Sequence, residues 1–167
     1  ATLQEAIQSG LGDELSPDGH GEPPAKEAPK AEPPKPELPF WAKPEGLAPD
    51  PERPGYTLAG DAYSGNPEAS LVVVEFTDFQ CPSCRRHALE TQPALDRDYV
   101  ETGKVLWVAK HLPLKMHPRA PVAAVAAECA GDQGRFWEMR HLLFEQVEAW
   151  SKEEGDADAE LARLAGR

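Results

Sequence analysis

The chain has 167 residues, and its 17 lysines and arginines stand against 29 aspartates and glutamates, a formal net charge of −12 at pH 7. Such a negative balance argues against nucleic acid or an anionic membrane surface as a partner, since both would repel the chain. The length suffices for one domain with additional segments. Three cysteines are too few for a disulfide scaffold, and no 18-residue apolar run predicts a membrane span.

The first 55 residues are predicted to lie outside the folded domain. Residues 1–16 carry apolar side chains at four-residue spacing and predict a short helical segment. Residues 17–55 read as an extended arm, because 12 of the 38 residues from 17 to 54 are prolines and little apolar area is available to offset ordering entropy. We expect Phe40 and Trp41, the aromatic side chains of the arm, to bind a partner protein. A simple spacer to a membrane anchor is the alternative.

Residues 56–167 are predicted to fold as an α/β domain. The β-branched and aromatic run 71–76 is typical of a strand buried on both faces of a sheet. A helix that Pro93 kinks follows it, and a strand at 104–108 then completes a right-handed parallel crossover. The other expected elements are a first strand at 57–62, a turn at 65–67 and helices at 119–130, 134–150 and 156–165.

Two cysteines stand where the 71–76 strand gives way to the next helix, in the motif Cys81-Pro82-Ser83-Cys84. The free N–H groups and the positive dipole end of that helix favour a thiolate at Cys81. Pro82 suits the first helical position, where no N–H is needed, and Pro82 and Ser83 together tune the oxidising strength of the pair. Cys84, one turn later, can attack a mixed disulfide at Cys81. The motif predicts a redox-active dithiol, with a structural disulfide without turnover as the alternative.

Charged residues near the motif fit this chemistry. Arg85 and Arg86 oppose the helix dipole in the first turn, which makes most sense beside an anionic thiolate. Glu75 interrupts an apolar strand six residues before Cys81, so we expect a desolvated carboxyl with a raised pKa that exchanges protons with the thiols. Because side chains alternate along a strand, an exposed Glu75 is the alternative. Asp78 is expected to order the loop before the helix.

The remaining thiol and the histidines carry weaker signals. Cys129 lies in an Ala/Val-rich helical run and is expected to be a small buried apolar residue, with a regulatory thiol as the alternative. His117 is interpreted as a loop or helix-entry residue. A metal site would need Cys81 and Cys84 together with a distant histidine, and no ligand spacing supports it. The sequence therefore predicts no metal and no cofactor other than the dithiol itself.

The block from Glu75 to Cys84 resembles the active-site segment of DsbA-like thiol–disulfide oxidoreductases, in the thioredoxin superfamily. The resemblance continues through shorter motifs at 111–114, 117–118, 126–131 and 134–137. It implies a thioredoxin-like fold with a helical insertion, Cys81 as nucleophile, Cys84 as resolving thiol and an acid at Glu75. It further implies a periplasmic or otherwise extracytoplasmic enzyme that exchanges disulfides with protein thiols.

One family feature is absent from this sequence. The family places a cis-proline, usually after Thr or Val, near the C-terminal end of the fold, and none of the prolines that follow Cys84 stands there. We therefore expect the C-terminal strands to be missing from this sequence and one sheet edge to be open. The alternative function that follows is a non-catalytic accessory subunit of a membrane-associated complex, held by the Pro-rich arm. In either case a segment outside this sequence would supply a membrane tether.

Overall fold

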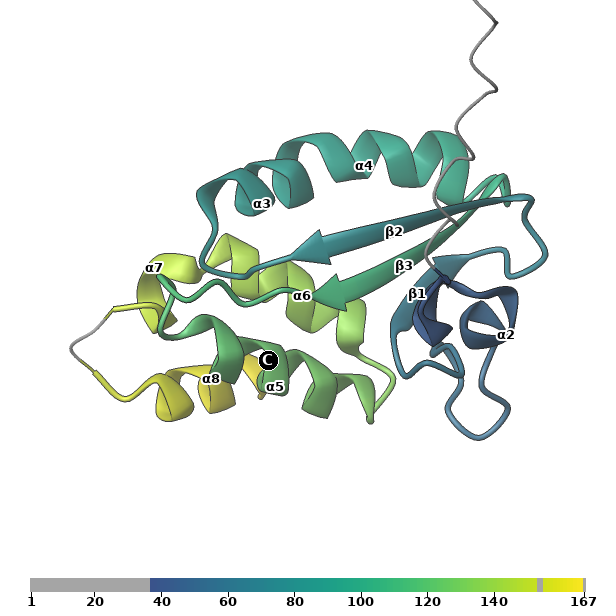
Figure 1. Ribbon diagram of the computed structural model, residues 1–167. Coiled ribbons are helices and arrows are strands. Elements are labelled where there is room, and N and C mark those ends of the chain that lie inside the picture. Colours follow the sequence, from purple (N-terminus) through teal and green to yellow (C-terminus); the bar gives the residue numbers. More distant parts are fainter. Residues whose placement is uncertain (1–36, 153–154, 167) are drawn as a thin grey trace, which may run out of the picture. The chain divides into compact units, whose positions relative to one another are not determined.

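Three strands form the centre of the structure, in the order β1-β3-β2 (Figure 1). The structure is a computed structural model that describes residues 37–152 and 155–166. Strand β3 (Val105–His111) pairs antiparallel with β1 (Ala62–Gly65) and parallel with β2 (Leu71–Thr77). The parallel β2–β3 pair, joined through helices, confirms the predicted crossover and the thioredoxin-like α/β class.

The strand buried on both faces is β3, so the prediction that residues 71–76 take this position is wrong. Residues 105–109 are all buried. Among the described strands β2 is hydrogen-bonded only to β3, and its Leu71 and Phe76 side chains are 54% and 45% exposed. Both strands have the same apolar, β-branched composition, and such a run does not distinguish a central strand from an edge strand.

The first strand begins five residues later than predicted. Tyr56 pairs with Ala62 across a turn in which the Gly60 N–H donates to the Thr57 carbonyl, and Gly60 adopts a φ of 84°. The predicted strand residues therefore form the turn. Gly65 ends β1 at a φ of 91°, where a Cβ would collide with the Val105 carbonyl. The turn predicted at 65–67 lies at 66–69, where the Ala69 N–H donates to the Asn66 carbonyl at 3.0 Å.

One long helical segment follows the cysteine motif and changes its winding along the way. It comprises α3 (Pro82–Arg86), the π-helical η2 (His87–Thr91), α4 (Gln92–Leu95) and the π-helical η3 (Asp96–Val100). Pro93 lacks the N–H that an α-turn would donate four residues back, and the wider π-turns on either side accommodate that loss. The predicted interruption at Pro93 is confirmed as a change of winding.

The C-terminal part consists of helices that pack on one another. They are α5 (Ala120–Gly131), α6 (Phe136–Glu145), α7 (Val147–Trp150) and α8 (Ala157–Ala165). The helix predicted at 134–150 divides at Gln146, and the other two agree with expectation. Phe136, Met139 and Leu143 of α6 are almost completely buried in the main core, as their spacing predicts.

Residues 40–61, here called the N-terminal strap, fold onto the sheet, and the compact unit begins at Glu37. The strap contains η1 (Phe40–Ala42) and α2 (Pro44–Leu47). Its Trp41 ring meets Phe76 of β2 edge-on at 5.4 Å between ring centroids. The proline-rich composition predicts an extended arm up to residue 55, whereas the backbone of the strap forms hydrogen bonds in turns and isolated bridges. Residues 1–16 and 17–36 lie outside the described residues.

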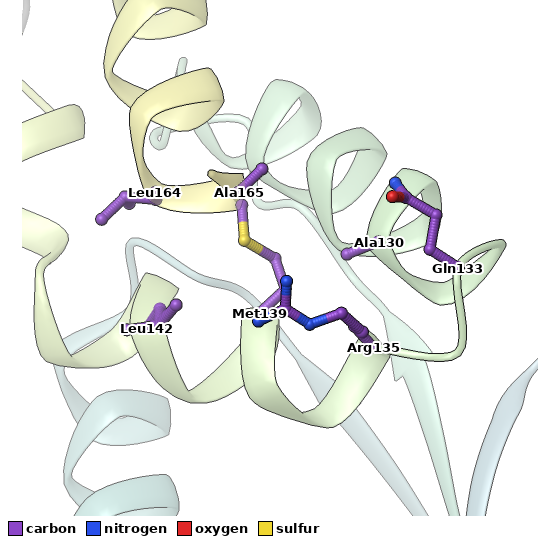
Figure 2. Close-up of a pocket in the computed structure, with 7 residues that line it drawn as sticks. All are labelled: Ala130, Gln133, Arg135, Met139, Leu142, Leu164 and Ala165. Atoms are coloured by element: carbon purple, nitrogen blue, oxygen red, sulfur yellow. The ribbon is translucent and has the colours of Figure 1, made fainter. Parts of the chain in front are cut away.

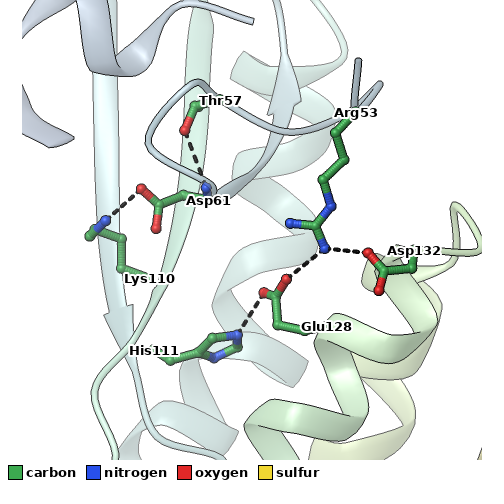
Figure 3. A network of polar contacts seen from close by, with 7 residues as sticks. All are labelled: Arg53, Thr57, Asp61, Lys110, His111, Glu128 and Asp132. Atoms are coloured by element: carbon green, nitrogen blue, oxygen red, sulfur yellow. Dashed lines mark hydrogen bonds and ion pairs between the residues drawn. The ribbon is translucent and has the colours of Figure 1, made fainter. Parts of the chain in front are cut away.

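A polar network ties the strap to β3 and α5 (Figure 3). Arg53 donates from Nη2 to Glu128 at 3.1 Å and to Asp132 at 2.7 Å. Glu128 also contacts Nε2 of His111 at 3.0 Å. Nearby, Lys110 of β3 forms an ion pair with Asp61 at the end of the strap. These contacts join chain segments that are far apart in the sequence, so they contribute to the tertiary structure of the unit.

We expect the unit to lose stability on acidification partly through Glu128. Burial opposes ionisation of this carboxyl, but the hydrogen bonds and charges of His111 and Arg53 outweigh burial and lower its pKa. A depressed folded-state pKa gives stability above the unfolded-state value that is lost as the pH falls through the folded value. Thermal unfolding of the wild type and of Glu128→Gln from pH 7 to 3 checks this. The stability difference between them should shrink below about pH 4.5, and a constant difference would contradict the assignment.

Candidate active site

Cys81 is the N-cap residue of α3, directly after an extended loop, with φ of −73° and ψ of 121°. Burial favours its neutral thiol, but the backbone N–H groups of Cys84 and Ser83 and the Cys84 thiol favour the thiolate and lower the pKa of Cys81. The charge of Asp78 opposes them. The first-turn N–H groups of the helix thus stabilise a thiolate, as the motif predicts.

Cys84 has the opposite electrostatic environment. Its pKa is raised, first by burial and then by its neighbour Cys81, against the lowering effects of the Asp78 N–H and the Thr77 hydroxyl. That hydroxyl is buried without a well-aligned hydrogen bond, so it acts on the sulfur weakly. The two half-buried thiols shift each other's pKa in opposite directions, down at Cys81 and up at Cys84. The pair therefore combines one readily ionised sulfur with one that holds its proton.

The residues beside the cysteines divide into exposed and anchored ones. Pro82 and Ser83 are exposed at the surface around Cys81. Arg86, one turn further along, is also exposed. Arg85 donates from Nε to the Phe144 carbonyl at 2.8 Å, which fixes α3 to α6. The groups that act most strongly on Cys81 are backbone N–H groups and the Cys84 thiol, so the structure gives Arg85 an anchoring contact where the sequence suggested tuning.

Glu75 points into the domain, which excludes the exposed alternative. Its two carboxylate oxygens accept from Nη2 of Arg140 at 2.8 Å each, and Oε2 also accepts from Nε1 of Trp107 at 3.0 Å. The Glu75 and Arg140 side chains are only 11% and 6% exposed. These contacts of the carboxylate are structural, and the proton exchange expected of it stays a prediction.

Asp78 and His117 form a polar pair at the site that the sequence analysis did not assign to catalysis. The Asp78 carboxylate is buried, and Oδ2 accepts from Nδ1 of His117 at 2.9 Å and from the Leu114 N–H at 2.7 Å. Oδ1 accepts from the Gln80 N–H, so the predicted loop-ordering role is supported by its contacts. His117 stands 39 positions further along the chain, and no spacing in the sequence links the two residues.

Cys129 and Trp41 have surroundings that differ from those predicted. Cys129 is exposed, so its prediction as a buried residue is wrong; the buried side of α5 carries alanines such as Ala123 and Ala127 instead. Trp41 packs on Phe76 and under the Lys110 ammonium within its own unit. Phe40 remains 54% exposed and available to another molecule.

No cluster of metal ligands accompanies the cysteines in the part of the chain that the structure describes. Within those residues, no three His, Cys, Asp or Glu side chains cluster as metal ligands would. Nor does any helix there have the length and apolarity needed to cross a bilayer. A small pocket between α5, α6 and α8, lined by Met139, Leu142 and Leu164 among others (Figure 2), has room for one water molecule. None of the predicted site residues lines it.

The family model described as thioredoxin matches residues 57–166. The chain belongs to the thioredoxin family. Its architecture matches solved DsbA-type structures: α-DsbA1 of Wolbachia pipientis at 25% identity with a TM-score of 0.58, covering 74% of this chain and 57% of that one. Oxidised BdbD of Bacillus subtilis matches at 26% identity with a TM-score of 0.58, covering 67% and 60%. The DsbA-like resemblance seen in the motifs is thus confirmed for this thioredoxin-family chain.

The thioredoxin-family domain also has relatives in sequence that carry a transporter name. A Salinispora arenicola protein named Na⁺/H⁺ antiporter NhaA 1 is 46% identical over 84 residues, which are 50% of this chain and 12% of that protein. A Mycolicibacterium gilvum protein of the same name is 45% identical over 97 residues, 57% of this chain and 14% of that protein. The chain thus spans only a small part of the length of these relatives.

Proposed function

We propose that the protein is a thiol–disulfide oxidoreductase that exchanges disulfides with protein thiols through Cys81 and Cys84. The observation that carries the proposal is the opposite ionisation tendency of two adjacent sulfurs at one helix N-terminus. The half-buried Cys81 is flanked by the exposed Pro82 and Ser83, a surface that another polypeptide can approach. Membership of a DsbA-like thioredoxin family supports the same reaction.

In the reducing direction, the Cys81 thiolate attacks one sulfur of a substrate disulfide. A Cys81–substrate bond forms, and the other substrate sulfur leaves as a thiolate that takes up a proton. Cys84 then gives up its proton and attacks the Cys81 sulfur, which releases the second substrate thiolate and closes the Cys81–Cys84 disulfide. Two electrons pass from the dithiol to the substrate, and the reverse sequence oxidises a substrate dithiol. The dithiol is the only redox group that these steps require.

The test uses three single variants with the wild type. Cys81→Ser should reduce the rate of insulin disulfide reduction to the uncatalysed rate, because no attacking thiolate remains. Cys84→Ser should accumulate mixed disulfides that do not resolve. Cys129→Ser, which removes an exposed thiol outside the motif, should change neither property.

The same samples report on Cys81 itself. In the wild type, its alkylation rate against pH should show an apparent pKa below that of free cysteine. A Cys81 that alkylates as free cysteine does, in a protein whose turnover survives Cys81→Ser, would overturn the proposal.

A second candidate function is favoured by the transporter-named relatives. A region similar to this domain occurs within proteins named Na⁺/H⁺ antiporter NhaA. On this reading the domain is an accessory part of a membrane-associated assembly, with residues 17–55 as the arm and the exposed Phe40 as its contact. The cysteine experiment separates the two candidates: unreactive thiols in a protein that co-purifies with membrane subunits would favour the accessory role.

We infer an extracytoplasmic location for either candidate. Dithiols that form protein disulfides operate where disulfides persist, in oxidising compartments outside the cytoplasm. A membrane tether would come from a segment outside this sequence. Boundaries at residues 16 and 55 remain our proposal for the arm, whose last part, residues 40–55, is shared with the strap and belongs to the compact unit.

A further inference from the structure

Asp78 and His117 stand at the active site, yet the exchange reaction as written uses neither of them. Asp78 occupies the loop between β2 and Cys81, where its carbonyl accepts from the Cys81 N–H at 3.1 Å and its own N–H acts against burial to lower the pKa of Cys84. Its side chain is 2% exposed. A buried carboxylate beside a nucleophilic thiolate is unfavourable for both, since each anion raises the other's energy.

The structure offsets that charge with one titratable group. His117 reaches the Asp78 carboxylate from the segment between β3 and α5, with its Nδ1 at 2.9 Å from Oδ2. The imidazole donates this hydrogen bond in its neutral or its protonated form, and only the protonated form carries a positive charge. The net charge beside Cys81 therefore depends on the state of His117.

The other charged groups on the adjoining elements have partners of their own. His111, at the end of β3, contacts Glu128. Arg85 of α3 donates to the Phe144 carbonyl, and Arg119, at the start of α5, donates to the Gly155 carbonyl. Lys115, close to His117 in the chain, is exposed to solvent, where screening weakens its influence. Replacement of His117 leaves these charged groups and their contacts unchanged.

We propose that Asp78 and His117 act as a positioning pair that sets the reactivity of Cys81: the Asp78 carboxylate disfavours the thiolate, and protonated His117 cancels that charge. The proposal rests on the proposed function, because it concerns the nucleophile of that reaction. The electrostatics of the site agree in sign, since the Asp78 charge acts to raise the pKa of Cys81. While His117 is neutral, the pair keeps the net negative charge of Asp78 and the thiolate is less favoured. Cys81 then titrates in two coupled steps.

The test measures the thiolate absorbance and alkylation rate of Cys81 from pH 3 to 10 in four proteins. His117→Gln keeps an N–H donor for Asp78 but removes the titrating charge. It should give a single-step profile and lower the thiolate fraction about three- to tenfold at pH values where His117 is protonated. Asp78→Asn should raise the thiolate fraction by a similar factor. His141→Gln, which removes an exposed histidine of α6, should match the wild type.

The double variant distinguishes coupling from two separate effects. Without the Asp78 charge, His117 has no negative charge to cancel, so adding His117→Gln to Asp78→Asn should change the profile little near neutral pH. If the Asp78–His117 pair had only a structural role, the substitutions would alter the unfolding midpoint and leave the pH profile of Cys81 unchanged. Identical profiles for the wild type and His117→Gln, or strictly additive effects, would overturn the proposal. If Asp78→Asn fails to fold, the His117→Gln profile alone decides.

This readout is independent of turnover. The absorbance and alkylation of Cys81 need no disulfide substrate, so the pair can be confirmed or rejected even in a protein that exchanges no disulfides. Conversely, a protein with full exchange activity and a single-step titration of Cys81 would reject the pair and leave the proposed function intact.

Discussion

Replacement of Arg140 by methionine should destabilise the domain by about 3–5 kcal/mol, the usual consequence of removing one partner of a buried ion pair. Glu75 would be left as an 11% exposed carboxylate whose only remaining donor among the described contacts is the Trp107 indole. Methionine fills a similar volume, so the loss reports mainly on the unpaired charge. Urea unfolding measures this loss of stability, provided that the dependence of the unfolding free energy on urea concentration is the same in both proteins.

The double variant Glu75→Gln/Arg140→Met tests this cause. It removes both charges, while the side-chain carbonyl of the new glutamine can still accept from Trp107, so much of the stability should return. The exposed Glu160–Arg163 pair on α8 provides the matched control, because its side chains are 41% and 46% exposed. Arg163→Met should cost less than about 1 kcal/mol. Equal losses of stability in Arg140→Met and Arg163→Met would show that burial of the Glu75–Arg140 pair does not increase the cost of breaking it.

Phe144→Ala should also cost about 3–5 kcal/mol, because it opens a cavity in the core between α6 and the cysteine loop. The Phe144 ring is fully buried and lies 5.0 Å from the Phe79 ring, centroid to centroid. The Arg85 contact is to the backbone carbonyl and survives the substitution. Since Phe79 stands two residues before Cys81, the alkylation rate of Cys81 should change together with the unfolding midpoint.

An exposed valine calibrates this result. Val125 is 60% exposed on α5, so Val125→Ala removes methyl groups that water already contacts and should change stability by less than about 0.5 kcal/mol. If Phe144→Ala lowers the free energy of unfolding no more than Val125→Ala does, the Phe79–Phe144 contact does not support the cysteine loop.

The sequence was most informative where local chemistry decides structure. A strand followed by Cys81 and Pro82 predicted both the helix start and the lowered pKa of the thiol, because an N-terminal helical turn needs only neighbouring residues. The helical spacing of apolar positions likewise placed Met139 and Leu143 in the core. These features depend on contacts within a few residues along the chain.

The features that sequence reasoning missed depend on partners far apart in the chain. Glu75 is paired with Arg140, 65 positions later, and Asp78 with His117, 39 positions later. Nothing in the local pattern at Glu75 distinguishes a carboxylate that shuttles protons from one that an arginine holds. The edge position of β2 has the same origin, since strand order is set by pairing and not by composition.

The strap has a practical consequence for anyone who shortens the gene. The family match begins at residue 57, and a clone cut there would discard Trp41, which shields Phe76, and Arg53, which holds Glu128 and Asp132. Such a clone would lose the Trp41–Phe76 ring contact and the Arg53 ion pairs, and Phe76, already 45% exposed, would become more so. A cut near residue 36 follows the physical boundary of the compact unit instead.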